Sequence, residues 1–406
     1  MRKQARLSRH RRGRIDWKDG AKNEGDNKPK QNNLKKPKTQ DQHKTKHNHN
    51  SKHDKKSSKY ETDYYEDNDS EEQEDDYEDE YEDYLKSEAD ALNNTKKAQV
   101  EVVIFNRVPK VGSQSMMQLM MELGKVNGFI HSRNAGKAHE TIMLKPPLQK
   151  ELIEEIYKKP RPHIYSQHLA YVNFTRFHMP KPIYINLVRD PVERIISWHY
   201  YVRADWYYRD MKLKLGDKAP NRPSDEFMNM DFDTCVQKKD KYCQFNQMEI
   251  KNPAGDHRRQ TLFFCGQNHQ LCMPFNSEAA MQKAKRTVEE EYAVVGTWED
   301  TNITLSVLEH YVPRFFKNAK TVYHLKRDHL SKVNKNNSTR PVSEFTKEIL
   351  RKNLTREIEF YEFCKQRLYL QYAAINDGES LDNDEYMMIP DHEDDDDDEN
   401  EEDDDN

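Results

Sequence analysis

The fold is decided by residues 102–115, which read VVIFNRVPKVGSQS. The β-branched and aromatic residues 102–105 predict a strand, and the apolar spacing of residues 116–123 predicts a helix directly after the turn. Such a strand–turn–helix unit can bind anions, because backbone N–H groups and the helix dipole at the helix start attract a phosphate. Lys110 adds a positive charge to the turn. The turn lacks the GxxxxGK[ST] pattern of nucleoside triphosphatases, so it predicts a site for a different phosphate-bearing ligand.

Charge divides the chain into four parts. Residues 1–59 contain 20 Lys/Arg and 6 Asp/Glu, residues 60–95 contain 17 acids and one lysine, and residues 376–406 contain 18 acids and no Lys or Arg. None of these segments has enough apolar side chains to offset the entropy lost on ordering. We therefore expect a basic disordered segment at 1–59, an acidic tyrosine-rich disordered linker at 60–96, a folded domain at 97–375 and an acidic disordered tail at 376–406.

The folded domain is basic although the whole chain has a formal charge of −6. Residues 96–375 contain 45 Lys/Arg and 31 Asp/Glu, which gives a charge near +14. A domain with this charge favours polyanionic partners, such as nucleic acid, an acidic membrane or a sulfated glycan. Charge alone does not distinguish among them.

The domain alternates between strand-like and helix-like stretches, which is typical of an α/β fold with a central parallel sheet flanked by helices. Ligands of such folds bind at the carboxyl ends of the strands. Residues 203–275 have no clear periodicity and are expected to be irregular. The other predicted elements are helices at 147–157, 191–198, 278–291, 303–316 and 343–373, and strands near 164–165 and at 183–188, 292–297 and 320–325.

All five cysteines lie in the predicted domain. The pairs Cys235–Cys243 and Cys265–Cys272 enclose seven and six residues, a wider spacing than the two to four residues between paired zinc ligands. Two local disulfides, with Cys364 as a buried thiol, are therefore the favoured interpretation. A zinc site that includes His257 or His269 is the alternative.

The cysteine pairs indicate the secretory pathway, as do the glycosylation triplets Asn-x-Ser/Thr. These triplets begin at Asn93, Asn173, Asn302, Asn336, Asn337 and Asn353. The sequence contains no apolar run of 18 or more residues and no signal peptide. Taken by itself, that pattern would predict a cytosolic protein. We instead expect that the true N-terminus is missing from this chain or that the isoform lacks its anchor.

Three stretches resemble the uronyl 2-O-sulfotransferases: Arg107–Lys110 before Gly-Ser, Pro182–Pro191 and Phe263–Gly266. The similarity covers about residues 97–373 in the same order, and the opening turn is most similar to that of the insect Pipe proteins. The resemblance implies a P-loop-like sulfotransferase fold, 3′-phosphoadenosine 5′-phosphosulfate as the sulfuryl donor, and no metal. It also implies an acidic glycan acceptor rather than nucleic acid, and a type II membrane protein of the Golgi lumen. Some relatives form trimers, so a homotrimer is expected.

The resemblance assigns the donor site to two stretches. The turn and the first helical residues would grip the 5′-phosphosulfate, and Lys110 would also neutralise the bridging oxygen as the S–O bond breaks. Arg189 and Ser197 would contact the 3′-phosphate, and the basic loop from Lys326 to Lys335 would close over the nucleotide. The residues assigned to the 5′-phosphosulfate are Lys110, Val111, Gly112, Ser113, Gln114 and Ser115.

His168 is the candidate catalytic base, because its segment Tyr165–Leu169 matches the catalytic histidine segment of the family, and an imidazole can take a proton near neutral pH. Heparan sulfate enzymes carry a second histidine where this chain has Ser166. The dermatan/chondroitin enzyme has one at the position of Ala170. The leading hypothesis is sulfuryl transfer to the 2-hydroxyl of a uronic acid, and the alternative is a catalytically impaired glycan-binding protein. Arg107 is the candidate acceptor contact, and weaker ones are His131, Trp198, Tyr201, Arg203 and Arg209.

Overall fold

The computed structural model describes residues 83–133, 142–250, 258–332 and 339–376. All of them belong to one compact unit, Asp67–Asn406. The predicted basic segment 1–59, most of the acidic linker and nearly all of the acidic tail lie outside the described residues, so the predicted division of the chain into tails and domain stays a prediction.

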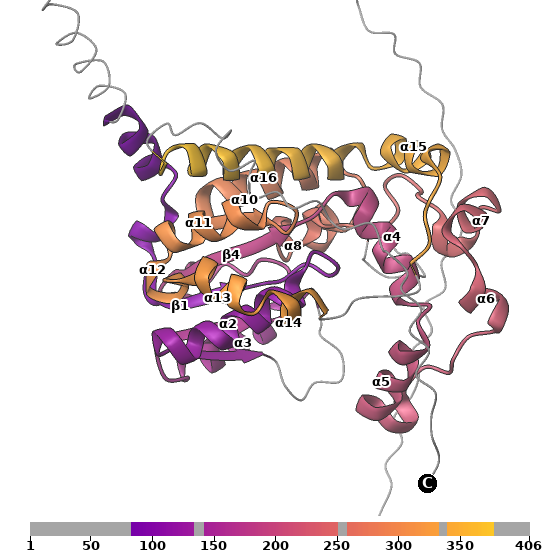
Figure 1. Cartoon of the computed structure of the whole chain (residues 1–406), viewed down its shortest axis with the longest axis horizontal. Helices are drawn as coiled ribbons and strands as arrows, with labels where there is room; N and C mark the ends of the chain where they lie inside the picture. The colour runs from indigo at the N-terminus through magenta and orange to yellow at the C-terminus, as the bar shows by residue number, and fades with distance from the viewer. Residues whose placement is uncertain (1–82, 134–141, 251–257, 333–338, 377–406) are drawn as a thin grey trace, which may run out of the picture. The chain divides into compact units, whose positions relative to one another are not determined.

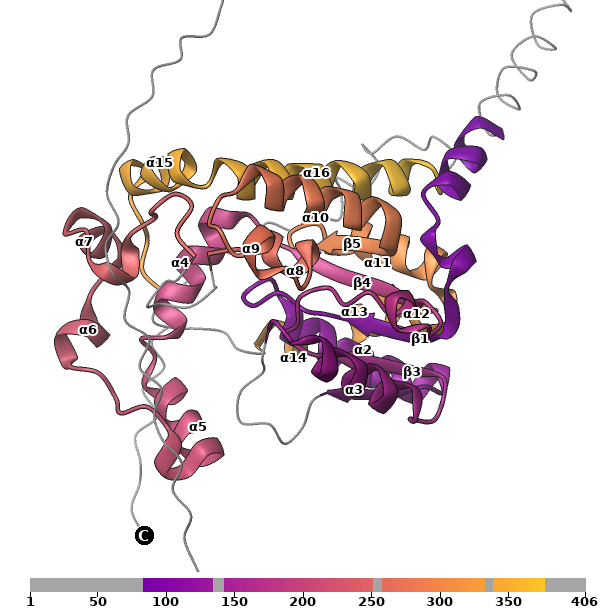
Figure 2. The ribbon, with the colours of Figure 1, turned by 180° about the vertical axis from the view of Figure 1, so that it is seen from behind.

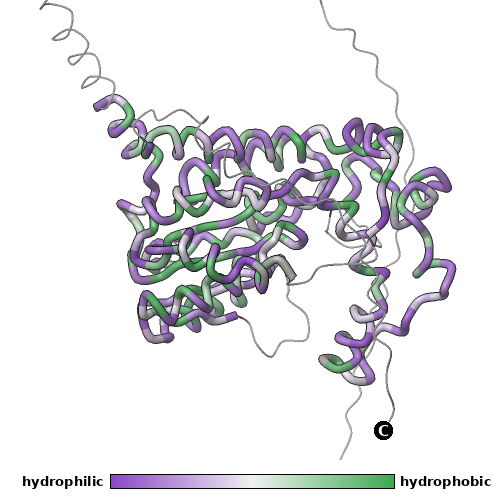
Figure 3. The backbone as a smooth tube through the Cα atoms, in the orientation of Figure 1, coloured by the Kyte–Doolittle hydropathy of each residue, from purple (hydrophilic) through white to green (hydrophobic). Residues whose placement is uncertain are grey.

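Five strands in the described part of the chain form one parallel sheet in the order β2–β3–β1–β4–β5 (Figure 1). Every residue of β4 and β5 is buried, as expected for strands covered on both faces. Hydrophobic residues run along both of these strands (Figure 3). The predicted α/β class with a central parallel sheet is therefore confirmed. The strands are β1 (Gln99–Phe105), β2 (Ile130–Arg133), β3 (His163–Ser166), β4 (Pro182–Val188) and β5 (Tyr292–Thr297).

Helices cover the two faces of the sheet and one of its edges. Figure 1 shows α2, α11 and α13 in front of the sheet, and the reverse view in Figure 2 shows α3, α8 and α10 in front of it. The long helix α16 packs along the edge strand β5 together with α10 and α11. These helices are α2 (Ser113–Asn127), α3 (Pro146–Tyr157), α8 (Thr261–Cys265), α10 (Glu278–Glu291), α11 (Thr301–Tyr311), α12 (Pro313–Phe316), α13 (Ala319–Leu325), α14 (Arg327–Lys332) and α16 (Thr355–Ala373).

The segment after β4 builds a second, smaller hydrophobic core. Side chains of α4, α7 and α15 share it, among them Ile195, Phe232 and Leu350. Residues 203–275, predicted to be irregular, contain several short helices, because polar residues such as Asp231 and Asn268 cap their N-termini. The elements not yet named are α4 (Pro191–Tyr201), α5 (Asp205–Leu215), α6 (Asp225–Asn229), α7 (Phe232–Gln237), α9 (His269–Cys272), α15 (Glu344–Asn353), and the 3₁₀ turns η1 (Asn94–Lys97), η2 (Thr175–Phe177), η3 (Gly216–Lys218) and η4 (Lys241–Cys243).

The predicted strand at 320–325 is wrong, because this segment is helix α13. Its β-branched and aromatic residues favoured a strand by propensity alone. Asn318 adopts the left-handed conformation just before the helix, and α13 packs on α2 and α11, so packing overrides propensity. Other differences are smaller. Strand β2 was not predicted, and the single helices expected at 303–316 and 343–373 are each divided in two.

The end of the acidic linker is folded, although the sequence predicted disorder up to residue 96. Residues 83–91 are helical, and Leu85 and Ala89 are buried. The Tyr311 hydroxyl donates to the carbonyl of Ala89, and the Arg367 guanidinium donates to the carbonyl of Leu92. These buried residues and hydrogen bonds order the segment in spite of its negative charge. The acidic composition of the segment gave no sign of them. Among the described residues, no helix combines the length and hydrophobicity needed to cross a bilayer.

Candidate active site

The carboxyl ends of four neighbouring strands bring most of the predicted site residues to one edge of the sheet. In the order of the sheet, β3 leads to His168, β1 to Arg107 and Lys110, β4 to Arg189, and β5 to Glu299. Parallel strands end at the same edge, so residues up to about 190 positions apart in the sequence become neighbours. The predicted position of the site is therefore consistent with the topology.

The turn between β1 and α2 exposes the N-terminus of a helix. Lys110 and Gly112 both have positive φ, 64° and 76°, which turns the chain sharply into α2. Gly112 is the N-cap residue and no side chain caps this end of the helix. The first intrahelical bond runs from the N–H of Met116 to the carbonyl of Gly112, so the N–H groups of residues 113–115 precede the helical ladder. This end of α2 is therefore suited to an anion.

Gly112 is required for close packing as well as for its backbone angle. A Cβ atom at this position would lie 2.5 Å from Cγ of Trp298, the first residue after β5. Any larger residue would push the indole and the turn apart. Trp298 therefore packs directly against the turn between β1 and α2.

Lys110 is half-buried and lies beside a second cation. Burial, and the positive charge of Arg189, lower the pKa of Lys110 to about 8. Its Nζ atom lies 4.2 Å from the centre of the Tyr201 ring on α4. Two cations at one strand edge form a site of positive potential, and an anion bound there would favour the charged form of the lysine.

Arg189 has two partners. Its side chain lies near Glu299, which follows β5, and its backbone N–H donates to the Gln260 side chain just before α8. Its Nε lies 3.9 Å from Oε1 of Glu299, and both side chains are about one-third exposed, 33% and 36%. The same carboxylate accepts from the N–H of Asp190, and burial raises the pKa of Glu299. Ser197 lies on the following helix, α4, and is half-buried. The Arg189 side chain therefore lies beside a carboxylate and stays partly exposed to solvent.

His168 is anchored to the turn that carries Lys110. Its Nδ1 lies 2.9 Å from the carbonyl oxygen of Arg107. A carbonyl can only accept, so Nδ1 carries the proton and Nε2 is the basic nitrogen. The ring is half-buried. This tautomer is the one that a general base needs.

A second histidine, His131, contacts Ser166, the residue two positions before His168. His131 on β2 pairs through Nε2 with the Ser166 hydroxyl at 2.8 Å. Burial, with smaller effects of His163, Arg133 and Arg107, lowers the pKa of His131 to about 4. The ring is therefore neutral near neutral pH. Arg107 itself is buried.

Other predicted residues have structural contacts. The Ser115 hydroxyl donates to the carbonyl of Leu330, which ties α14 to α2, and Val111 is fully buried. The basic loop expected from Lys326 is helical at Arg327–Lys332, and residues 333–335 lie outside the described part.

Two acceptor candidates differ in their surroundings. Arg203 is buried, stacks on Phe227 of α6 at 4.1 Å and donates to the carbonyl of His199 of α4, so it connects these two helices. Arg209 is exposed on α5.

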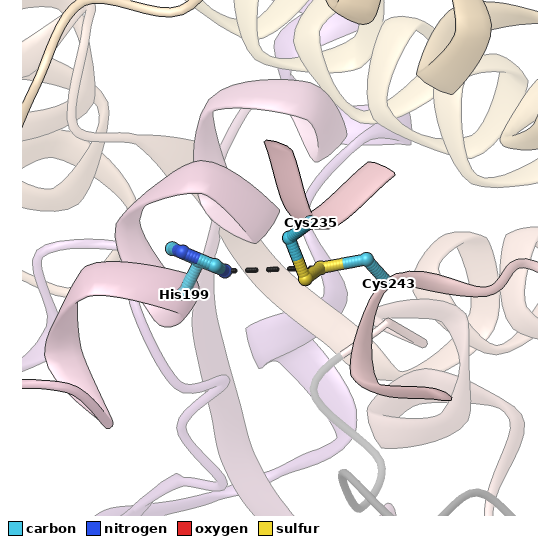
Figure 4. A group of neighbouring side chains, drawn as sticks. All are labelled: His199, Cys235 and Cys243. Atoms are coloured by element: carbon cyan, nitrogen blue, oxygen red, sulfur yellow. Dashed lines mark hydrogen bonds between the residues drawn. A yellow bond between two sulfur atoms is a disulfide. The ribbon is translucent and has the colours of Figure 1, made fainter. Parts of the chain in front are cut away.

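Both predicted disulfides are confirmed. Cys235 pairs with Cys243 and Cys265 with Cys272, while Cys364 is a buried free thiol. The zinc alternative is wrong for these cysteines, because their sulfurs are bonded to each other. His199 lies beside the first disulfide, 3.8 Å from Sγ of Cys243 (Figure 4), and His257 lies outside the described residues. The contact joins α4 to the small core.

Comparison with known proteins agrees with this geometry. The model of the "Sulfotransferase family" matches residues 93–364. The chain belongs to the sulfotransferase family. It is 69% identical over 306 residues to the Drosophila melanogaster protein "Uronyl 2-sulfotransferase homolog pip". That alignment covers 75% of this chain and 60% of the Drosophila protein, so the chain spans less than two-thirds of this relative.

More distant relatives are heparan sulfate enzymes by name. The human "Heparan sulfate 2-O-sulfotransferase 1" is 30% identical over 295 residues, which cover 71% of this chain and 75% of the human protein. The Caenorhabditis elegans "Heparan sulfate 2-O-sulfotransferase hst-2" is 31% identical over 307 residues, with coverage of 72% and 87%. The predicted resemblance to uronyl 2-O-sulfotransferases is therefore confirmed.

Sequence reasoning did not single out Trp298 and Glu299, which contact the candidate residues Gly112 and Arg189. Both directly follow β5, a strand that was predicted correctly. The rule that sites of α/β folds lie at strand carboxyl ends could have identified them.

Proposed function

We propose that the chain transfers a sulfuryl group from 3′-phosphoadenosine 5′-phosphosulfate to the 2-hydroxyl of a uronic acid in a glycosaminoglycan or related glycan. The observation that carries this proposal is the bond from His168 to the carbonyl of Arg107. It supports the role of His168 as the base, because it leaves Nε2 as the basic nitrogen beside the turn that carries Lys110, the residue that we propose binds the donor. The family and the names of the relatives support the same reaction.

The donor fits the residues at the strand edge. The N-terminus of α2 has no side-chain cap, and Lys110 and Arg189 supply two positive charges without requiring a metal. The backbone of residues 110–115 would hold the 5′-phosphosulfate, and Arg189 with Ser197 would hold the 3′-phosphate. The donor supplies an activated sulfuryl group whose leaving group is a phosphate. Lys110 would stabilise the negative charge that develops on that phosphate.

The base works on the acceptor side. Nε2 of His168 would remove the proton from the sugar hydroxyl as the oxygen bonds to sulfur, while the Arg107 carbonyl stabilises the resulting imidazolium through Nδ1–H. The products are a sulfate ester and adenosine 3′,5′-bisphosphate. The Arg107 side chain would contact the anionic acceptor. The neutral ring of His131, held by Ser166, is available as a hydrogen-bonding group.

We also propose a cellular location and an oligomeric state for the chain. Two disulfides favour an oxidising compartment, in agreement with a Golgi lumen enzyme. A type II membrane arrangement and a homotrimer are proposed from the family resemblance alone.

The experiment is sulfate incorporation by the purified chain from labelled donor into heparan, dermatan and chondroitin acceptors. His168→Ala should lower kcat by about 10²–10⁴-fold, the usual contribution of a general base. The exposed His310→Ala is the matched control and should behave as wild type. Equal incorporation by His168→Ala and wild type would refute the role of the base. Retention of glycans without turnover, and without affinity for adenosine 3′,5′-bisphosphate, would support the glycan-binding alternative.

A further inference from the structure

The aromatic residues at the end of α4 and the start of α5 form a cluster centred on Tyr201. Trp198 lies 5.7 Å from the Tyr201 ring, Trp206 lies 5.3 Å away and Tyr207 lies 5.0 Å away. The last two meet Tyr201 edge to face, at interplanar angles of 76° and 62°. Edge-to-face contacts of this kind are favourable and fix ring orientation. The plane of Tyr201 is therefore set by its neighbours on both helices.

The face of Tyr201 is turned toward the Lys110 ammonium, with 4.2 Å between Nζ and the ring centre. This distance lies well within the range of a cation–π interaction. Among the described residues, no carboxylate forms an ion pair with Lys110, and its charged neighbour is the cation Arg189. The ring is thus the stabilising group that the structure provides for this buried charge.

We propose that Tyr201 is a positioning residue that holds the Lys110 ammonium at the N-terminus of α2, and that Trp206 and Tyr207 of α5 keep its ring in place. The inference rests on the proposed function, in which Lys110 stabilises the leaving phosphate. It gives Tyr201 a different role from stacking on a sugar. A ring face occupied by an ammonium is not available to a sugar at the same time.

The charged groups around the pair are few. Arg189 faces Lys110 from the end of β4, and Tyr207, Asp210 and Arg107 act on Tyr201. Burial raises the pKa of the Tyr201 phenol to about 12, so the ring stays neutral at working pH. Removing the ring leaves burial and Arg189 unopposed. The pKa of Lys110 should then fall further below its value of about 8.

The test measures the pKa of Lys110 directly, by the pH dependence of its amine labelling in the full chain, read by mass spectrometry. Tyr201→Leu removes the π face, and Tyr201→Phe keeps it while removing the hydroxyl. The pKa should fall by about one unit in Tyr201→Leu and stay at the wild-type value in Tyr201→Phe. Trp206→Ala, which keeps the Tyr201 side chain but removes one of its two edge-to-face neighbours, should give a smaller fall. An unchanged labelling pKa in Tyr201→Leu would overturn the proposal.

Enzyme assays provide the second measurement. The alkaline limb of kcat/KM for the donor should move to lower pH in Tyr201→Leu, and Tyr201→Phe should restore it. A loss of stability alone would not shift the limb, and Tyr201→Phe behaving as Tyr201→Leu would overturn the cation–π account. Absence of sulfate transfer in wild type, with the labelling shift intact, would refute the proposed function and leave the role of Tyr201 standing.

Discussion

The two glycines that flank α2 allow two effects on stability to be measured separately. One is the packing of the turn between β1 and α2, and the other is the strain of its backbone. Gly112 and Gly128 both adopt left-handed conformations, with φ of 76° and 66°. An alanine at either position would have the strain of that conformation, roughly 1–2 kcal/mol. A Cβ at Gly128 would meet nothing within 4 Å, whereas one at Gly112 would lie 2.5 Å from Cγ of Trp298.

We therefore expect Gly128→Ala to lower the free energy of unfolding by about 1–2 kcal/mol and Gly112→Ala by about 2–5 kcal/mol, because overpacking adds about 1–3 kcal/mol. At about 2 °C per kcal/mol for a domain of this size, Tm should fall by about 2–4 °C and about 4–10 °C respectively. Urea denaturation and calorimetry measure both quantities. Adenosine 3′,5′-bisphosphate affinity should fall in Gly112→Ala only.

A double-mutant cycle makes the reasoning refutable. In a Trp298→Ala background, Gly112→Ala should cost only its backbone strain, about 1–2 kcal/mol. Equal destabilisation by Gly112→Ala and Gly128→Ala would show that the indole does not support the turn. An undiminished cost in the Trp298→Ala background would show the same.

Three further predictions follow from burial and charge. The value of kcat/KM for the donor should fall above a pH of about 8, because in our proposal the charged Lys110 ammonium is the active form and it loses its proton there. Lys110→Arg should move this alkaline fall in kcat/KM upward by more than one pH unit in the same assay. Glu357→Ala should lower the free energy of unfolding in urea by about 3 kcal/mol or more, since this buried carboxylate accepts from the N–H groups of Gln260 and Thr261 and interacts with the charge of the buried Arg194. Cys265→Ser should cost about 2.5 kcal/mol in urea without reductant, from the short loop that its disulfide closes.

Each of these predictions has a control. An alkaline limb unchanged in Lys110→Arg would assign it to another group. Glu348→Ala should cost less than 1 kcal/mol, because that exposed carboxylate pairs only with Arg351 in the described structure. Wild-type stability in Cys265→Ser would contradict the disulfide estimate, and reductant should remove the difference between the two proteins.

The buried strands were predictable from the sequence because their apolar runs are continuous. β4 and β5 were found at 183–188 and 292–297, and the structure places them at Pro182–Val188 and Tyr292–Thr297. β2 was missed because its residues, IHSR, are partly exposed and polar. The segment 320–325 was wrongly predicted as a strand, because its conformation is decided by tertiary packing and not by local propensity.

The positions of candidate residues at strand ends were predictable from the sequence. Contacts that depend on the direction of a side chain were not. The strand–turn–helix pattern pointed to Lys110 and the family resemblance to Arg189, and the structure has both residues at the carboxyl ends of neighbouring strands, β1 and β4. The cation–π contact of Tyr201 depends on the rotation of α4 about its axis, and the bond of His168 depends on the path of residues 106–109. Neither can be obtained from residue spacing.

The anchor of His168 has an evolutionary consequence. Its partner is a peptide carbonyl, which every amino acid provides, so no substitution of the side chain at position 107 removes it. In the proposed mechanism, Arg107 contacts the sugar and His168 is the base, so natural selection could replace the Arg107 side chain to suit a new sugar while His168 keeps its tautomer. Recognition and proton transfer would then share one residue but not one chemical group, and acceptor preference could diverge among descendants of a common ancestor without loss of catalysis.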